Sequence, residues 1–192
     1  NAGADALMNG DLTINGGSTS ISVGDNFVVN DGDITVDGGT LDIAAGDTFN
    51  TDPDTTANLI EVTNGGSFSV DLSGGNTGDF TLGEEDTFRL NGSTSSATIT
   101  ADDAVRFDGT VQLQDEATLT VNGGTTYLDS TAKFEGSETN PGTLILSEGS
   151  LSIDEPLVAF RPNITFNNDT DQDITAPNTD SSILNLGTIT KE

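Results

Sequence analysis

The apolar residues of this chain recur in short alternating pairs, separated by glycines and small polar residues. Leu12 and Ile14 form one such pair, and Ile34 and Val36 form an equivalent pair 22 residues later. The i, i+2 spacing places both side chains of a pair on the same face of a β-strand. The pattern predicts many short strands, and no segment combines a helical apolar period with capping residues.

A longer repeat surrounds these pairs. Residues 10–27, GDLTINGGSTSISVGDNF, return at 32–49 as GDITVDGGTLDIAAGDTF, with an offset of 22 residues. Glycines between the pairs supply corners, where positive φ angles are needed. Such a period is typical of a solenoid. We therefore expect an all-β fold, a single-stack right-handed parallel β-helix of about 6–8 coils of roughly 19–27 residues each.

The repeat degrades along the chain and divides it into three parts. We expect residues 1–9 to be an N-terminal lead-in or assembly segment and 10–160 to be the solenoid. Residues 161–192 return to strand-like alternation and are expected to be a cap or an assembly element. Two polar insertions, 50–58 and 73–79, are expected to protrude as corner loops, because insertions in solenoids leave the stack intact.

Phenylalanines fall at comparable points of successive coils. Stacked equivalent rings form an internal ladder in a solenoid, and the alternation places them inside rather than on an exposed carbohydrate platform. The predicted core ladder consists of Phe27, Phe49, Phe88, Phe107, Phe134 and Phe160.

Composition limits the function classes. The 192 residues fit one domain with a thin core, and 32 acidic against 5 basic residues give a net charge of −27. Such a field repels nucleic acid and anionic membrane surfaces, so neither is expected as a partner. The acidity keeps a repetitive β protein soluble, and cation binding or adaptation to salt are the alternatives.

Several catalytic and metal-binding chemistries lack their residues. The chain has no Cys and no His, which excludes disulfides, thiolate nucleophiles, Ser-His-Asp triads and His-ligated zinc. No apolar run approaches the roughly 20 residues that cross a bilayer. The chain begins at Asn1, as a processed secreted protein or a trimmed segment would, and we expect an extracellular or cell-surface location.

One acidic segment has the spacing of a calcium loop. Asp169, Asp171, Asp173 and Asp180 supply oxygen ligands at positions that an EF-hand-type loop uses. However, Ile174 stands where that loop needs glycine, so a solvated acidic loop is the alternative. No other cofactor is expected.

No catalytic residue is predicted. Paired carboxylates can hydrolyse glycosides, but in so acidic a chain such pairs arise by chance, and the basic and aromatic residues that hold a sugar are few. Thr-x-Thr is not sustained along the sequence, which counts against an ice-binding solenoid.

The pattern from Gly10 to Gly17, with its later form Leu119 to Thr125, resembles the stacked coils of bacterial surface β-helices. Autotransporter passengers and filamentous adhesins are the nearest families, and the likeness covers roughly residues 10–160 as repeat style. The resemblance implies an extracellular stalk, adhesin or fibre and carries over no active-site residue.

These features predict a non-enzymatic structural protein that stacks end to end into a surface filament or sheath. The predicted partner is a second copy, bound by β-strand augmentation. Apolar residues near both ends are the expected assembly residues: Leu7, Met8, Ile183, Leu184, Leu186 and Ile189. The alternatives are an adhesin or phage tail-fibre segment that binds glycans through the corner loops, and a polysaccharide-cleaving β-helix enzyme.

Overall fold

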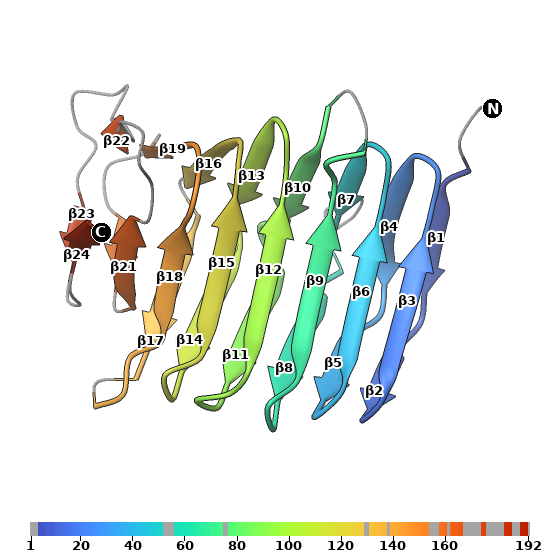
Figure 1. Cartoon of the computed structure of the whole chain (residues 1–192), viewed down its shortest axis with the longest axis horizontal. Coiled ribbons are helices and arrows are strands. Elements are labelled where there is room, and N and C mark those ends of the chain that lie inside the picture. The colour runs from blue at the N-terminus through green and yellow to red at the C-terminus, as the bar shows by residue number, and fades with distance from the viewer. Residues whose placement is uncertain are drawn as a thin grey trace.

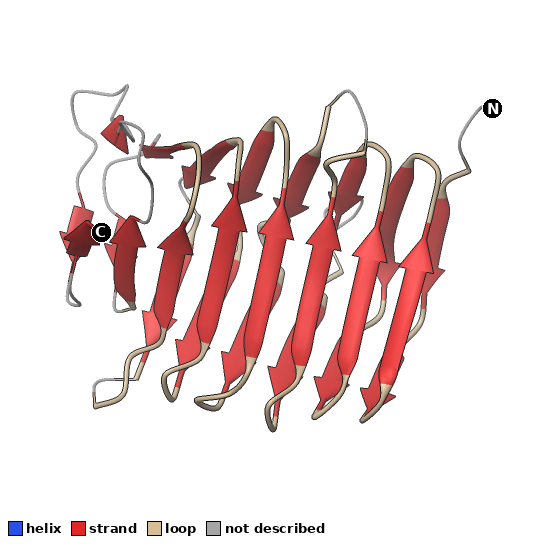
Figure 2. Ribbon diagram, in the orientation of Figure 1, coloured by secondary structure: helices blue, strands red, loops and turns tan. Residues whose placement is uncertain are grey.

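The computed structural model describes residues 4–51, 56–74, 77–128, 131–137, 139–153, 158–160, 162–166, 174–175, 183–185 and 189–191. These residues form strands, turns and loops, and no helix occurs among them (Figure 2). Every ladder between the strands is parallel, so the predicted all-β parallel β-helix is confirmed.

Three eight-stranded sheets make up the stack (Figure 1). Sheet A contains β1 (Ala6–Asn9), β4 (Asn26–Asp31), β7 (Thr48–Asn50), β10 (Asp79–Leu82), β13 (Ala104–Phe107), β16 (Thr125–Leu128), β19 (Ser150–Ile153) and β22 (Ile174–Thr175). Sheet B contains β2 (Leu12–Asn15), β5 (Ile34–Asp37), β8 (Leu59–Thr63), β11 (Thr87–Asn91), β14 (Thr110–Gln114), β17 (Lys133–Gly136), β20 (Val158–Phe160) and β23 (Ile183–Asn185). Sheet C contains β3 (Ser18–Ser22), β6 (Thr40–Ala44), β9 (Ser67–Asp71), β12 (Ser96–Thr100), β15 (Thr118–Asn122), β18 (Thr143–Leu146), β21 (Asn163–Phe166) and β24 (Ile189–Lys191).

Each coil passes through the three sheets in the order A, B, C. In Figure 1 the chain rises along sheet C at the front, crosses the top, descends at the back and advances from right to left, which is a right-handed path. This is the usual hand for a crossover between parallel strands. The 6–9 and 163–191 segments contribute strands to the same three sheets as the residues between them.

The core is a column of alternate side chains along the middle of the stack. In β5 and β6, for example, Ile34, Val36, Leu41 and Ile43 are at most 1% exposed, while the residues between them point outward. Coils pair in register, so each buried side chain lies over its equivalent one coil away. The period-2 pattern of the sequence therefore becomes one continuous apolar core.

Two sheets share the six residues of the predicted ladder, and five of the six are buried: Phe27, Phe49, Phe88, Phe107 and Phe134. Phe27 and Phe49 align in sheet A, while Phe88, Phe134 and Phe160 belong to one column of sheet B. Phe107 lies in sheet A at the next inward position, aligned with Leu82 and Leu128 rather than with the other rings. The ring that continues the Phe27–Phe49 column is Phe80. The preceding corner insertion lengthens its coil, so sequence spacing alone conceals this equivalence.

Candidate functional site

The end of the stack formed by β1, β2 and β3 is the strongest candidate site. These three strands are the last members of sheets A, B and C, and each pairs with another strand on one side only. An edge strand presents backbone N–H and C=O groups that can pair with a further strand. We call this surface, with the inward side chains of the first coil, the open end.

Apolar side chains at the open end are incompletely covered. Leu12 and Ile21 are partly buried against the core, whereas their equivalents Ile34 and Ile43 in the second coil are 0% and 1% exposed. Ala6, Met8 and Val23 of the first coil are partly buried in the same way, whereas Ile14 is 8% exposed and belongs to the core. The second coil is covered by a neighbouring coil on both sides, whereas the first coil is covered on one side only.

The structure separates the predicted assembly residues. Met8 packs against the core at the open end, while Leu7 faces outward from sheet A beside Val28 and is 60% exposed. Ile183, Leu184 and Ile189 belong to β23 and β24 at the opposite end, and Leu186 lies outside the described residues.

The sequence did not identify Leu12 and Ile21 as residues of this end. Their partial exposure follows from the position of β2 and β3 at the end of the described sheets, which residue type alone does not reveal.

The predicted calcium ligands Asp169, Asp171, Asp173 and Asp180 all lie outside the described residues. Within the described part of the chain, no group of three or more acidic side chains is arranged to hold a metal ion. The tips of the two predicted corner loops, residues 52–55 and 75–76, also fall outside.

A buried polar cluster lies at the corner between sheets A and B. The backbone N–H and side-chain amide of Asn58 donate to Asp86 Oδ1 at 2.7 and 3.1 Å, and Asn58 Oδ1 accepts from the N–H of Gly32 at 3.2 Å. Asp86 is 3% exposed, and its Oδ2 is buried without a hydrogen-bond partner in the described structure. Burial raises the pKa of Asp86, and donors on Thr51, Asn58 and Gly83 oppose this without cancelling it. The cluster links three coils where the chain re-enters the stack at β8.

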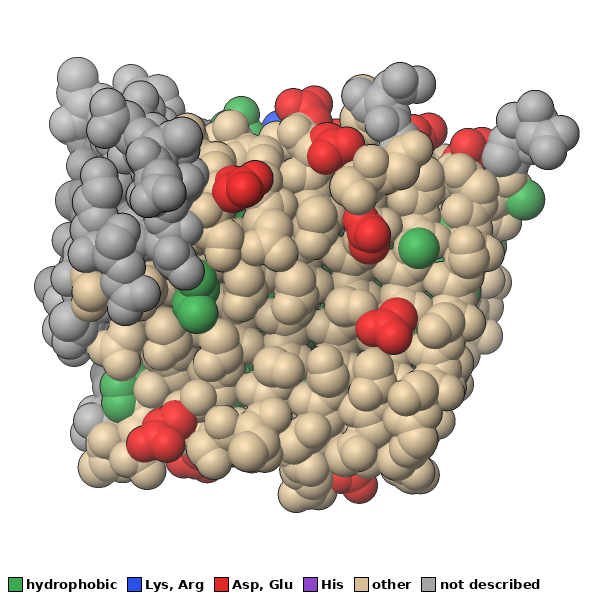
Figure 3. Space-filling model, viewed as in Figure 1, with side chains coloured by type: hydrophobic (Ala, Val, Ile, Leu, Met, Phe, Trp, Pro, Cys, Tyr) green, Lys and Arg blue, Asp and Glu red, His purple; other side chains and the backbone are tan. Residues whose placement is uncertain are grey.

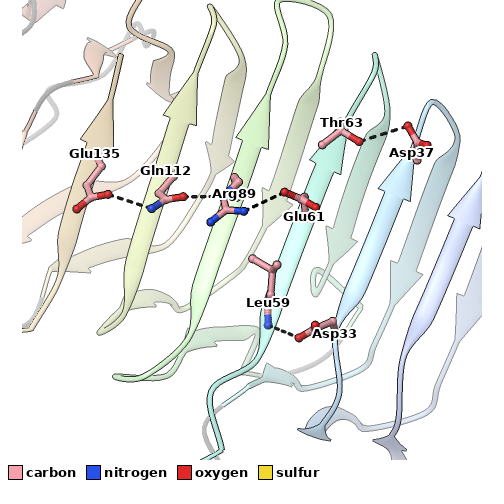
Figure 4. Close-up of polar contacts among 8 residues, drawn as sticks. All are labelled: Asp33, Asp37, Leu59, Glu61, Thr63, Arg89, Gln112 and Glu135. Carbon is pink, nitrogen blue, oxygen red and sulfur yellow. Dashed lines mark hydrogen bonds and ion pairs between the residues drawn. The ribbon is translucent and has the colours of Figure 1, made fainter. Parts of the chain in front are cut away.

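A row of polar side chains crosses the outer face of sheet B (Figure 4). Arg89 donates to Glu61 at 3.1 Å and to Gln112 at 2.6 Å, and Gln112 donates to Glu135 at 2.9 Å. These residues occupy one register column on β8, β11, β14 and β17. Their side chains bind one another, which is the arrangement of a cross-strand ladder that ties coils together.

Comparison of the chain with protein-family models, with curated proteins and with solved structures finds no match. In the part of the chain that the structure describes, no helix is long and apolar enough to cross a bilayer.

Proposed function

We propose that this chain is a non-enzymatic subunit of an extracellular filament or sheath of the bacterial surface type, assembled end to end. The observation that carries the proposal is the open end, where three parallel strand edges surround partly covered apolar residues of the first coil. A second copy stacked there buries those residues and pairs those edges.

The internal repeat supports a second copy as the partner. Residues 10–27 and 32–49 are identical at 9 of 18 positions, and the second coil presents to the first the same kind of face that the first coil presents at the open end. Each coil thus packs against the coil before it through a similar face. A coil of the same kind is the partner that this surface fits, and strand addition provides the hydrogen bonds.

The opposite end carries strands of the same three sheets in the same direction. Beyond β22, β23 and β24, the β1, β2 and β3 strands of a second copy continue sheets A, B and C without reversal. The register predicts the contacts, because Ser20 and Thr190 belong to the same outward column of sheet C. In the stacked assembly, Thr190 of one copy lies next to Ser20 of the next.

This register permits a direct test in a chain without native cysteine. Paired residues on neighbouring parallel strands are about 4.8 Å apart, within the range that a disulfide bridges. We expect the Ser20→Cys, Thr190→Cys double variant to form covalent dimers and longer ladders on oxidation, seen by non-reducing electrophoresis. Electron microscopy should show the corresponding filaments, with and without calcium.

The matched control is the Ser22→Cys, Thr190→Cys variant. Ser22 lies on the same outward face but two residues along β3, about 8 Å diagonally from the Thr190 position, beyond disulfide reach. Equal cross-linking in both variants indicates random collision. Monodisperse single copies at high protein concentration, with no ladder from the first variant, refute end-to-end stacking.

A further inference from the structure

The outer face of sheet C is a regular lattice of hydroxyl groups. Its first outward column is continuous over β3, β6, β9, β12, β15 and β18: Ser18, Thr40, Ser67, Ser96, Thr118 and Thr143. The second and third columns contain further hydroxyls, on Ser20, Ser22, Ser69, Thr98, Thr100 and Thr120. The other outward residues of these strands are Asp42, Ala44, Asp71, Asn122 and Ile145.

The strand geometry gives this lattice two fixed repeats. Hydroxyls in one column are about 4.8 Å apart, the distance between neighbouring strands, and columns are about 6.6 Å apart, two residues along a strand. Directly beneath, Leu41, Phe68 and Leu119 are fully buried, so the strands rest on a packed core. Figures 1 and 2 show these strands straight and side by side. The strand backbones therefore hold the Ser and Thr side chains in a fixed array before any ligand arrives.

The face is poor in charge and in long side chains, although the chain as a whole carries −27. Figure 3 views this side and shows mainly uncharged surface with a few separate acidic patches. Both carboxylates of the lattice are engaged: Asp42 accepts from the Ser69 hydroxyl at 2.5 Å, and Asp71 accepts from the backbone N–H and hydroxyl of Ser73 at 3.0 and 2.6 Å. Sheet B differs, because its outward residues include Glu61, Arg89 and Gln112.

We infer that the outer face of sheet C binds the surface of ice. Ice presents a flat, uncharged and repeating array of oxygen atoms, each able to donate and accept hydrogen bonds, separated by a few ångström. A preformed lattice of hydroxyls matches that chemistry, since each Ser or Thr hydroxyl also donates and accepts. Thr adds a methyl group beside its hydroxyl, so Thr98 and Thr120, neighbours in the central column, offer both apolar and polar contact to ordered water.

The same face suits a protein or glycan partner less well. Protein interfaces concentrate their binding energy in buried Trp, Tyr and Arg residues, and none occupies an outward position on β3, β6, β9, β12, β15 or β18. The face is also small for a stable dimer: strands of about five residues, six across, cover roughly 450 Å² per partner, below the roughly 800 Å² of a standard interface. No aromatic platform is present there for sugar stacking.

The pattern was hidden in the sequence because its columns mix Ser with Thr and the coils differ in length. A count of Thr-x-Thr tracts misses the lattice, and only the register of sheet C assembles it. The inference is independent of end-to-end assembly, because one copy already carries the face.

The test is the effect of the purified chain on ice growth, measured as thermal hysteresis by nanolitre osmometry and as enrichment in slowly grown ice. We expect the wild-type chain to be active and the Thr98→Lys, Thr120→Lys variant to lose activity, because two long charged side chains lift the face off the crystal. The matched control is Thr87→Lys, Thr110→Lys, an adjacent in-register pair on the outer face of sheet B, which should keep full activity. Circular dichroism establishes that both variants fold.

Several outcomes overturn the inference. The inference is overturned if the wild-type chain shows no thermal hysteresis and stays in the liquid fraction. It is also overturned if both variants lose activity equally. If the chain has no effect on ice but is retained on insoluble cellulose or chitin, the partner of sheet C is a glycan instead. If it has no effect on ice but sediments as a dimer that the Thr98→Lys, Thr120→Lys variant does not form, the partner is a second copy.

Discussion

Phe49 is the ring with the most aromatic contacts in the described core, and its removal should be the most costly single truncation. It stacks on Phe27 and Phe80 with centroids 5.5 and 5.2 Å apart and meets Phe68 edge-on at 6.2 Å. The side chain is fully buried. A buried Phe→Ala change costs about 3–5 kcal/mol through lost transfer energy and the cavity left behind. With three ring partners, we expect Phe49→Ala to lie at the upper end, near 5 kcal/mol.

Phe88→Ala provides the matched comparison. Phe88 is as deeply buried but contacts one ring in the described structure, Phe68 at 5.7 Å. Because each aromatic pair contributes about 0.5–1.5 kcal/mol beyond its buried area, the two further ring pairs of Phe49 predict a difference of roughly 1–3 kcal/mol between the variants.

Urea unfolding followed by far-ultraviolet circular dichroism measures both changes. The whole transition should be compared, because a solenoid with a weakened coil can unfold in more than one step. Equal destabilisation by Phe49→Ala and Phe88→Ala would show that the stacked rings contribute nothing beyond burial.

Three further changes test other parts of the stack. Burial raises the pKa of Asp86, so the folded chain keeps that proton to a higher pH than the unfolded chain. The resulting contribution to the free energy of unfolding falls as pH rises from about 3.9 through the raised value. Asp86→Asn should reduce this dependence of stability on pH in urea titrations in the acid range, and an unchanged dependence would contradict the assignment. Gly46→Ala places a methyl group against the carbonyl oxygen of Gly24 and should cost about 1–3 kcal/mol, whereas Gly74→Ala, with open space around it, should be neutral in the same assay. Arg89→Ala breaks a half-exposed ion pair with Glu61 and should lower the free energy of unfolding by about 1 kcal/mol or less, a loss that 1 M salt should reduce.

The sequence predicted the fold because its main signals are local. The i, i+2 pairs, the glycine corners and the exact offset of 22 residues each specify a short strand or a turn, and parallel stacking follows from their repetition. The Phe27–Phe49 contact was visible for the same reason, because no insertion separates those coils.

What the sequence concealed depends on register across insertions. Phe80 completes the Phe49 column and Asn58 is buried against Asp86, yet both follow segments that lengthen their coils. Insertions at corners leave strand pairing intact, but they remove the fixed sequence spacing between equivalent residues by which a repeat is recognised. The hydroxyl columns of sheet C were missed for this reason, and Leu12 and Ile21 were missed because their exposure depends on position in the stack rather than on residue type.

The parallel ladders also determine how the molecule responds to force. Their hydrogen bonds run from coil to coil along the long axis, so tension between the two ends is carried by all the ladders in series and peels the end strands first, because each of these has a neighbour on one side only. A coil of 22 residues that detaches releases about 70 Å of extended chain. Under load the stack would therefore lengthen in steps at low force, acting as an extensible tether rather than a rigid rod.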